Sequence, residues 1–310
     1  MSKAYGYSAY GGPENEIWFD RPEPTPGPSE LVIKVHAIGV NPVDFKVRAG
    51  MRADPAATPA FPMVLGSEAA GTVTAVGGDV EGFTVGDEVM GRAAPEHGTY
   101  AEHAVLLAAS TTHKPVNLDF VAAAALPVAG SSAWEALDRV KLHAGDTVLI
   151  NGIGGGVGVM AAQLARDRGA AVIGIGSEAK RRLTESLGAT LVTHDNGDVA
   201  ARVRELLPDG PDALIDLVGG NALNAVANLV GDPARIVSIV DPGVEALGGT
   251  FLISTGAGLE PVAELVATGK ADPKVLQTYP FDEAPTALRA VESGHTLGKV
   301  VIDLNRTTRT

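Results

Sequence analysis

The chain has 310 residues, of which 45% are hydrophobic and 20% charged, values that suggest a soluble globular protein of two domains. Its formal net charge of −13 argues against nucleic acid and anionic membrane surfaces as partners, because both attract basic patches. The chain contains no cysteine, which excludes disulfides, thiolate nucleophiles and zinc sites built on cysteine.

The N-terminal third reads as β-rich. The first residues lack the apolar core of a signal peptide, and no apolar run approaches the ~20 residues of a membrane span, so we expect a cytoplasmic protein. Alternating apolar residues and turn signals predict strands over residues 30–40, 69–76 and 87–90. Between the first two, Asn41 and Pro42 open a predicted short helix that ends at Arg48.

The hydrophobic period changes near Leu118. Asp119 is a candidate N-cap for a helix that runs through Val140, with a break near Pro127 and Gly130. From Asp146 on, strands and helices alternate. The strands are continuous apolar runs, as parallel strands buried on both faces require, and we place them at 147–151, 171–176, 191–194, 213–218, 235–240 and 250–254. This pattern predicts an α/β fold with a doubly wound parallel sheet.

The last forty residues read as a strand, a helix over 282–293 and a strand over 299–304. A six-stranded doubly wound sheet is already complete by Ser254, so we assign this C-terminal segment to the first domain. The predicted domains are therefore 1–118 with 270–310, and 119–269.

A glycine-rich turn joins the first strand of that sheet to the following helix. Gly152, Gly155 and Gly158 lie between the apolar run Thr147–Ile150 and a helix-forming run. A tight turn that brings a helix N-terminus close to an anion is what the pyrophosphate of a dinucleotide requires. The position of the turn between strand and helix gives the motif its weight, because glycine-rich runs alone are common.

Several further segments, in this order and spacing, complete a pattern. They are Asn41-Pro-Val-Asp44 with Arg48-Ala-Gly50, Gly66-Ser-Glu-Ala-Ala-Gly71, Gly98-Thr-Tyr-Ala-Glu102, Ala124-Ala-Leu-Pro-Val-Ala-Gly130, the glycine turn with Gln163, and Gly294-His-Thr-Leu-Gly-Lys-Val-Val301. On these segments the chain resembles the zinc-independent quinone oxidoreductases of the medium-chain dehydrogenase/reductase superfamily along nearly its whole length.

The resemblance implies a GroES-like first domain, completed by the C-terminal segment, and a Rossmann second domain. It implies NADPH between them and a homodimer paired through the sheet-edge strand near Phe251. It further implies cofactor-binding roles for Asn41, Ser132, Gly152, Gly155, Gly156, Val157, Gly158, Ser177, Lys180, His194, Val218, Ile239, Val240 and Lys299.

Three of these roles have equally plain alternatives. Asn41 is also a natural cap for the helix that begins at Pro42. Val218, Ile239 and Val240 also suit a core or strand-end position. His194 stands where the family usually has tyrosine, so a polar strand end explains it as well as a contact to the adenosine does.

The residues after the second strand bear on the choice between NADPH and NADH. An NAD site uses an acid at the tip of this strand to bind the ribose diol, whereas this strand ends Gly176-Ser177 and is followed by Lys180, Arg181 and Arg182. Such a basic cluster suits a 2′-phosphate and favours NADPH. Glu178 is the residue that supports the alternative, since its carboxylate suits a diol.

Zinc-dependent relatives place a cysteine near Asn41 and a histidine at Ser67. Neither ligand is present here, so we predict no metal. The sequence thus predicts an NADPH-dependent reductase of a quinone or an α,β-unsaturated carbonyl, with Asn41 as the candidate catalytic residue that donates a hydrogen bond to the acceptor oxygen. The alternatives are a nucleotide-binding sensor without turnover and, less favoured, a zinc alcohol dehydrogenase.

Overall fold

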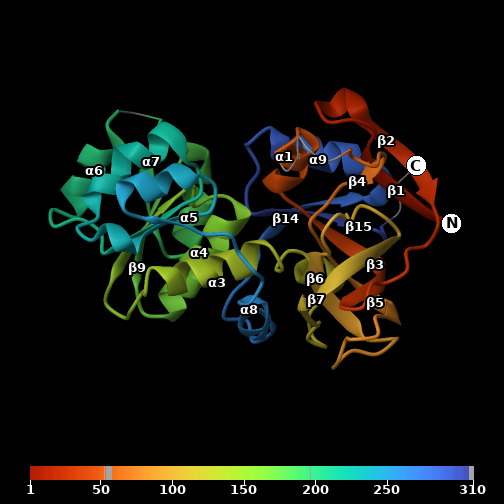
Figure 1. Ribbon diagram of the computed structural model, residues 1–310. Helices are drawn as coiled ribbons and strands as arrows, with labels where there is room; N and C mark the ends of the chain where they lie inside the picture. The colour runs from red at the N-terminus through yellow and green to blue at the C-terminus, as the bar shows by residue number, and fades with distance from the viewer. Residues whose placement is uncertain (52, 54–57, 196, 307–310) are drawn as a thin grey trace. The chain divides into compact units, whose positions relative to one another are not determined.

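The computed structural model describes residues 1–51, 53, 58–195 and 197–306, which form two compact units (Figure 1). The first unit comprises Met1–Val128 and Val275–Thr310, and the second comprises Ala129–Lys274. The C-terminal segment thus folds with the N-terminal one. Residues 119–128, which the sequence analysis assigned to the second domain, lie in the first unit because the helix they contain packs on its strands.

The first unit is built on a six-stranded sheet. Its strands, in spatial order, are β14 (Val275–Pro280), β15 (Lys299–Asp303), β3 (Glu30–Val40), β5 (Glu68–Val76), β6 (Glu88–Ala93) and β7 (His103–His113). Strand β3 also pairs with β7, so the last four strands close into a small barrel. A second sheet has the order β2 (Glu16–Arg21), β1 (Ser2–Tyr7) and β4 (Met63–Val64).

Three α-helices complete the described part of the first unit: α1 (Pro42–Arg48), α2 (Phe120–Ala124) and α9 (Ala284–Glu292). Helix α9 buries Ala284, Leu288 and Val291, which recur at helical spacing, in the same core as Ile33 and Ile302 of the sheet. Strands β15, β3 and β5 are neighbours in the six-stranded sheet, so residues at their ends lie close together although they are far apart in the sequence.

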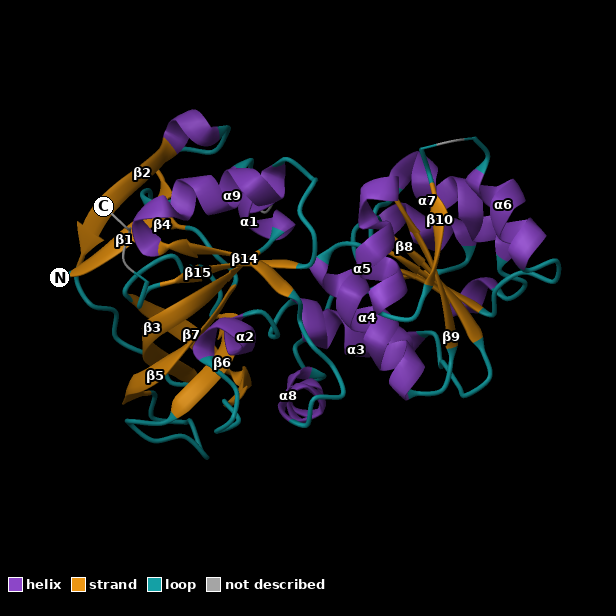
Figure 2. Cartoon of the chain, turned by 180° about the vertical axis from the view of Figure 1, so that it is seen from behind, coloured by secondary structure: helices purple, strands orange, loops and turns teal. Residues whose placement is uncertain are grey.

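The second unit holds a six-stranded sheet that is parallel throughout. In spatial order its strands are β10 (Thr190–Thr193), β9 (Ala171–Gly176), β8 (Thr147–Asn151), β11 (Ala213–Asp216), β12 (Ile236–Ser238) and β13 (Thr250–Phe251). Helices cover both faces of this sheet (Figure 2): α3 (Ala129–Arg139), α4 (Gly156–Asp167), α5 (Arg181–Ser186), α6 (Val199–Leu206) and α7 (Gly220–Val226). Helix α8 (Leu259–Ala267) packs against α3.

This architecture confirms the predicted fold class, an α/β doubly wound sheet with a β-rich partner. Strands β8 and β9 have the predicted bounds, whereas the predicted strands 213–218, 235–240 and 250–254 end earlier, at Asp216, Ser238 and Phe251. The Asp216 carboxylate at the end of β11 and the Ser238 hydroxyl at the end of β12 accept backbone N–H groups of the turns that follow, which stops the strand pairing there, and β13 pairs with β12 only as far as Phe251. In the part of the chain that the structure describes, no helix is long and apolar enough to span a membrane.

Candidate active site

The first unit contains a buried polar cluster where β3 ends and where β5 and β15 begin. Asn41, Glu68 and Lys299 form it, and their exposed fractions are 5%, 0% and 2%. The Lys299 ammonium donates to Glu68 Oε1 at 2.7 Å and to Asn41 Oδ1 at 2.8 Å, and Asn41 Nδ2 donates to Glu68 Oε1 at 2.7 Å. The structure therefore brings together the two predicted site residues of this unit, Asn41 and Lys299, through Glu68.

The two charged neighbours determine how the Asn41 amide is oriented. Its oxygen must face the ammonium and its nitrogen the carboxylate. The reverse orientation would place the amide N–H groups beside the ammonium, which only donates, and the amide oxygen beside the carboxylate, which only accepts. Nδ2 then donates to Glu68 and, at 3.3 Å, to the Gly39 carbonyl, so both of its N–H bonds are in use. Donation to an acceptor oxygen, the role the sequence analysis gave Asn41, requires one of these bonds to break. Its oxygen, which receives one bond from Lys299, retains capacity to accept another.

Lys299 is similarly engaged. Its third hydrogen bond goes to the Val40 carbonyl at 3.3 Å, so all three donors of the ammonium have partners inside the unit. Glu68 Oε2 accepts the Val128 backbone N–H at 2.6 Å. These bonds make Lys299 and Glu68 the groups that orient the Asn41 amide.

A second carboxylate, Asp44 in the first turn of α1, lies next to this cluster and is 1% exposed. Its Oδ1 accepts the Ser67 hydroxyl at 2.6 Å, and its Oδ2 accepts the Asn41 backbone N–H at 2.9 Å and the Tyr100 hydroxyl at 3.1 Å. Burial raises the pKa of Asp44 to about 6, opposed by its hydrogen bonds to Ser67 and Asn41 and reinforced by the negative charge of Glu68.

In the second unit, the glycine turn links β8 to α4 as predicted. Gly152 has a φ of +92°, and Gly155 is the N-cap of α4. The first N–H groups of an α-helix lack acceptors within it, so those of Gly156, Val157 and Gly158 suit an anion. A Cβ at Gly155 would lie 3.9 Å from the Gly152 oxygen with no closer contact, whereas one at Gly158 would lie 2.6 Å from the Gly152 oxygen and the Ile153 backbone. Gly155 therefore leaves room for a ligand, and Gly158 lets helix and strand pack.

A buried carboxylate organises the neighbouring strand ends. Asp216, fully buried at the end of β11, accepts hydrogen bonds from Asn151 Nδ2 at 2.8 Å, Ser238 Oγ at 2.7 Å and the Gly219 N–H at 3.1 Å. These bonds tie together β8, β11 and β12. They place Val218, 55% exposed, and the half-buried Ile239 and Val240 at the carboxyl edge of the sheet, where such folds bind dinucleotides.

The segment after β9 carries the residues predicted to contact the adenosine ribose. The Lys180 side chain lies over the turn, since a Cβ at Gly154 would be 2.5 Å from its Cδ. Ser177 caps the short 3₁₀ turn Glu178–Lys180, and its carbonyl accepts the Lys180 N–H. Burial lowers the pKa of Lys180. The structure thus brings Ser177 and Lys180 together beside the glycine turn.

The acids near this segment already have partners. Glu178 Oε2 accepts from Arg181 Nη2 at 2.8 Å, which commits the carboxylate that would serve a ribose diol. Asp195 Oδ2 accepts the Glu178 N–H at 2.6 Å, and its Oδ1 lies 3.2 Å from Nδ1 of the exposed His194. His194 therefore belongs to the surface at the end of β10. Ser132, in the first turn of α3, is 3% exposed.

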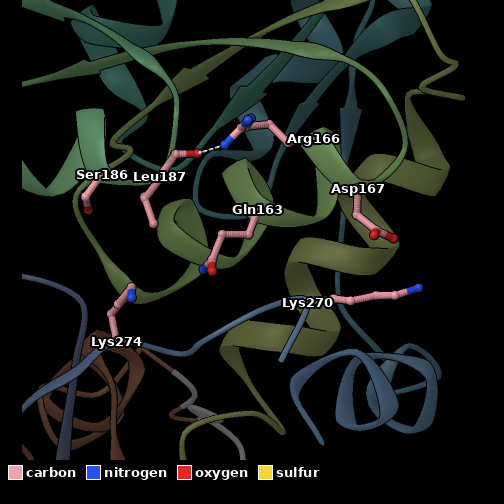
Figure 3. Close-up of a pocket in the computed structure, with 7 residues that line it drawn as sticks. All are labelled: Gln163, Arg166, Asp167, Ser186, Leu187, Lys270 and Lys274. Atoms are coloured by element: carbon pink, nitrogen blue, oxygen red, sulfur yellow. Dashed lines mark hydrogen bonds between the residues drawn. The ribbon is translucent and has the colours of Figure 1, made fainter. Parts of the chain in front are cut away.

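A separate cavity of about 330 Å³ lies beside the last turns of α4 (Figure 3). Its lining is polar, and Arg166, one of the lining residues, donates to the Leu187 carbonyl at 2.8 Å. Because α4 begins at the carboxyl ends of the strands, its last turns lie toward the opposite edge of the sheet. The lining residues are Gln163, Arg166, Asp167, Ser186, Leu187, Lys270 and Lys274, none of which is a predicted site residue.

The residues at the two zinc-ligand positions do not fit zinc. The Asn41 amide is bonded to an ammonium and a carboxylate, and the Ser67 hydroxyl donates to Asp44. Zinc in proteins is held by sulfur, imidazole and carboxylate ligands. Within residues 1–51, 53, 58–195 and 197–306, no group of three or more His, Asp or Glu residues is placed to hold a metal ion.

Sequence reasoning missed the roles of Asp44, Glu68, Ser67 and Asp216. One signal was present: Glu68 is a charged residue within the run of small residues Gly66–Gly71, and a buried carboxylate needs a cationic partner. That partner, Lys299, lies 231 residues further along the chain and becomes evident only when β15 pairs with β3.

This two-unit fold, with its glycine turn at a parallel sheet, is that of the medium-chain oxidoreductases. Residues 27–116 match the alcohol dehydrogenase GroES-like domain, and residues 187–302 match the domain described as zinc-binding dehydrogenase. The chain belongs to the quinone oxidoreductase family of the medium-chain dehydrogenase/reductase superfamily.

Three relatives illustrate the match. The mitochondrial NAD(P)H oxidoreductase RTN4IP1 of Homo sapiens is 32% identical over 89% of this chain and 82% of its own length. The chloroplastic NADPH-dependent alkenal/one oxidoreductase of Arabidopsis thaliana is 32% identical over 97% of this chain and 79% of its own. The quinone oxidoreductase structure from Coxiella burnetii superposes with a TM-score of 0.87, at 30% identity, over 98% of this chain and 99% of that one.

Proposed function

We propose that this protein is an NADPH-dependent oxidoreductase that transfers hydride to a quinone or an α,β-unsaturated carbonyl without a metal. The observation that carries the proposal is the glycine turn of the second unit, with open space at Gly155 and the Lys180 side chain lying over the turn at Gly154. The relatives named for NADPH, alkenals and quinones support the cofactor and the acceptor classes.

The residues of the turn fit a dinucleotide. The N–H groups of Gly156, Val157 and Gly158 would bind the pyrophosphate, because they point out of the helix N-terminus and a side chain is missing at Gly155. Val218, Ile239 and Val240 would supply an apolar surface for the nicotinamide at the ends of β11 and β12. NADPH, when bound, supplies the hydride.

The 2′-phosphate is the feature by which the protein would select NADPH. Lys180 and the Ser177 hydroxyl would bind it, and the bond between Arg181 and Glu178 reduces the repulsion that a free carboxylate would exert. A ribose diol site would need Glu178 free to accept two hydroxyls.

In the first unit, the Asn41 amide and the Ser67 hydroxyl would bind a polar group of the cofactor or the acceptor. Lys299 and Glu68 orient the Asn41 amide so that its oxygen can accept a hydrogen bond from the cofactor or the acceptor. The Ser67 hydroxyl is the half-buried member of the neighbouring cluster and is accessible to a bound molecule.

Steady-state oxidation of NADPH with a panel of quinones and enones tests the proposal. We expect turnover with at least one member, preference for NADPH over NADH, and activity that survives dialysis against a chelator. Tight binding of NADPH with no turnover on any acceptor would favour the sensor alternative. About one zinc per chain, with activity lost to the chelator, would favour an alcohol dehydrogenase.

A further inference from the structure

We propose that Ser67 and Asp44 form a proton relay, in which the Ser67 hydroxyl protonates the reduced acceptor and is itself reprotonated by the Asp44 carboxyl. The inference rests on the proposed function, which requires a proton for every hydride that reaches a quinone or an enone. The structure contains a buried acid that can supply this proton, Asp44.

The hydrogen bonds around Asp44 determine which of its oxygens carries a proton. Oδ2 already accepts two hydrogen bonds, from the Asn41 N–H at 2.9 Å and the Tyr100 hydroxyl at 3.1 Å. Its lone pairs are therefore occupied, and a proton on the carboxyl resides on Oδ1. Oδ1 is the oxygen that lies 2.6 Å from Ser67 Oγ.

Among the described residues that bond to Asp44, only Ser67 is not buried, so this proton leaves the cluster through Ser67. Asp44 is 1% exposed, Tyr100 0% and Asn41 5%, whereas Ser67 is half-buried. When Asp44 is protonated, its O–H donates to Ser67 Oγ, and the serine hydrogen is released to point at a neighbouring molecule. When Asp44 is ionised, Ser67 donates back to it and offers no proton.

The charges around the carboxyl keep it titratable near neutral pH. Glu68 on β5 raises the pKa of Asp44 through its negative charge, and Lys299 on β15 lowers it, while Tyr100 faces it as a neutral donor. With burial as the largest cause, the pKa of Asp44 reaches about 6. A carboxyl with this pKa can release a proton and recover it from water within each turnover.

The hydride brings two electrons and one proton to the acceptor, which becomes an enolate or a hydroquinone anion. The Ser67 O–H bond breaks as its proton moves to the anionic oxygen, and the Asp44 O–H bond breaks as its proton moves to Ser67 Oγ. The products are the neutral reduced acceptor, an intact serine and an Asp44 carboxylate that water reprotonates.

Turnover measured between pH 5 and 8 tests the relay. In the wild type, kcat should fall about tenfold per pH unit above the pKa of Asp44, because the protonated carboxyl is the donor. Ser67→Ala should lower kcat about 100-fold at pH 6, within the range typical of general acid catalysis, and flatten the profile. Ser67→Thr, which keeps the hydroxyl, should restore most of the rate. Ser110→Ala, which removes a buried hydroxyl elsewhere in the unit, should leave kcat unchanged.

A second measurement uses the protein without cofactor. The infrared band of a protonated carboxyl should titrate with a midpoint near pH 6 and be missing in Asp44→Asn. In Ser67→Ala the midpoint should rise, because the serine hydrogen bond lowers the pKa of Asp44.

The outcomes separate the relay from the function on which it rests. If the wild type is active and Ser67→Ala has a kcat within twofold of it and the same pH profile, the relay is wrong and the proposed function stands. A carboxyl band that does not titrate near pH 6 would also overturn the relay alone. A wild type that oxidises NADPH with no acceptor would overturn the proposed function and the relay with it.

Discussion

At the scale of single residues, charges that lie far apart in the sequence are paired in the folded chain. Lys299 and Glu68 are almost fully buried, and each is the other's counter-ion at 2.7 Å. A buried ion pair need not add net stability, but removing one partner leaves an uncompensated charge in a medium that solvates it poorly. The pair is therefore best understood as the support that orients Asn41.

Lys299→Met should lower the free energy of unfolding by about 3–5 kcal/mol, because Glu68 then stays buried without its cation. The double variant Lys299→Met/Glu68→Gln should cost less than the sum of the single variants, since both charges are gone. Urea unfolding measures both, with Lys46→Met on the exposed face of α1 as the control. Equal costs for Lys299→Met and Lys46→Met would show that the buried pair has no such role.

Lys180→Ala should weaken NADPH binding about tenfold or more and leave NADH binding nearly unchanged. One charge-assisted bond is worth ~1.5–3 kcal/mol, and partial exposure reduces the effect toward the lower value. Glu178→Ala is the matched control, because the diol alternative predicts that it weakens NADH binding most. Fluorescence titration of both cofactors with wild type and both variants decides the matter, and a wild-type preference for NADH would contradict the assignment.

At the scale of elements, the sequence predicted what depends on local pattern. Continuous apolar runs located β8 and β9 to the residue, and Asp119 indeed caps α2 by accepting the Ala122 N–H. Strand β12 is shorter than predicted because its end depends on the non-local bond between Ser238 and Asp216, and β13 pairs with β12 only through Thr250 and Phe251. The polar cluster at Asn41 could not be predicted for the same reason: it depends on the pairing of β15 with β3.

The turn before α4 offers a test in which two neighbouring glycines behave differently. Gly155→Val should abolish NADPH binding while the protein stays folded, because the new side chain would enter open space where the pyrophosphate is proposed to lie. Gly158→Val should instead disrupt folding, since its Cβ would lie 2.6 Å from the backbone of Gly152 and Ile153. Circular dichroism and cofactor titration separate the two effects. Unchanged NADPH affinity in folded Gly155→Val would show that the pyrophosphate does not bind at this turn.

At the scale of the whole molecule, we expect a homodimer. Strand β13 is the outer strand of its sheet, and Ile253, just after it, is 75% exposed. An unpaired edge beside an exposed apolar side chain favours pairing with a second copy. Sedimentation should show a dimer that Ile253→Glu dissociates, whereas a wild-type monomer at micromolar concentration would rule out this interface.

Isotope labelling tests whether hydride passes directly from NADPH to the acceptor. NADPH carrying deuterium at C4, prepared separately for each face, is oxidised by the protein with an enone, and the product is analysed by mass spectrometry and NMR. One of the two preparations should deliver its deuterium to the β-carbon of the product, with the second hydrogen derived from water. A reduced product without deuterium from either preparation would contradict direct hydride transfer and the function proposed for this chain.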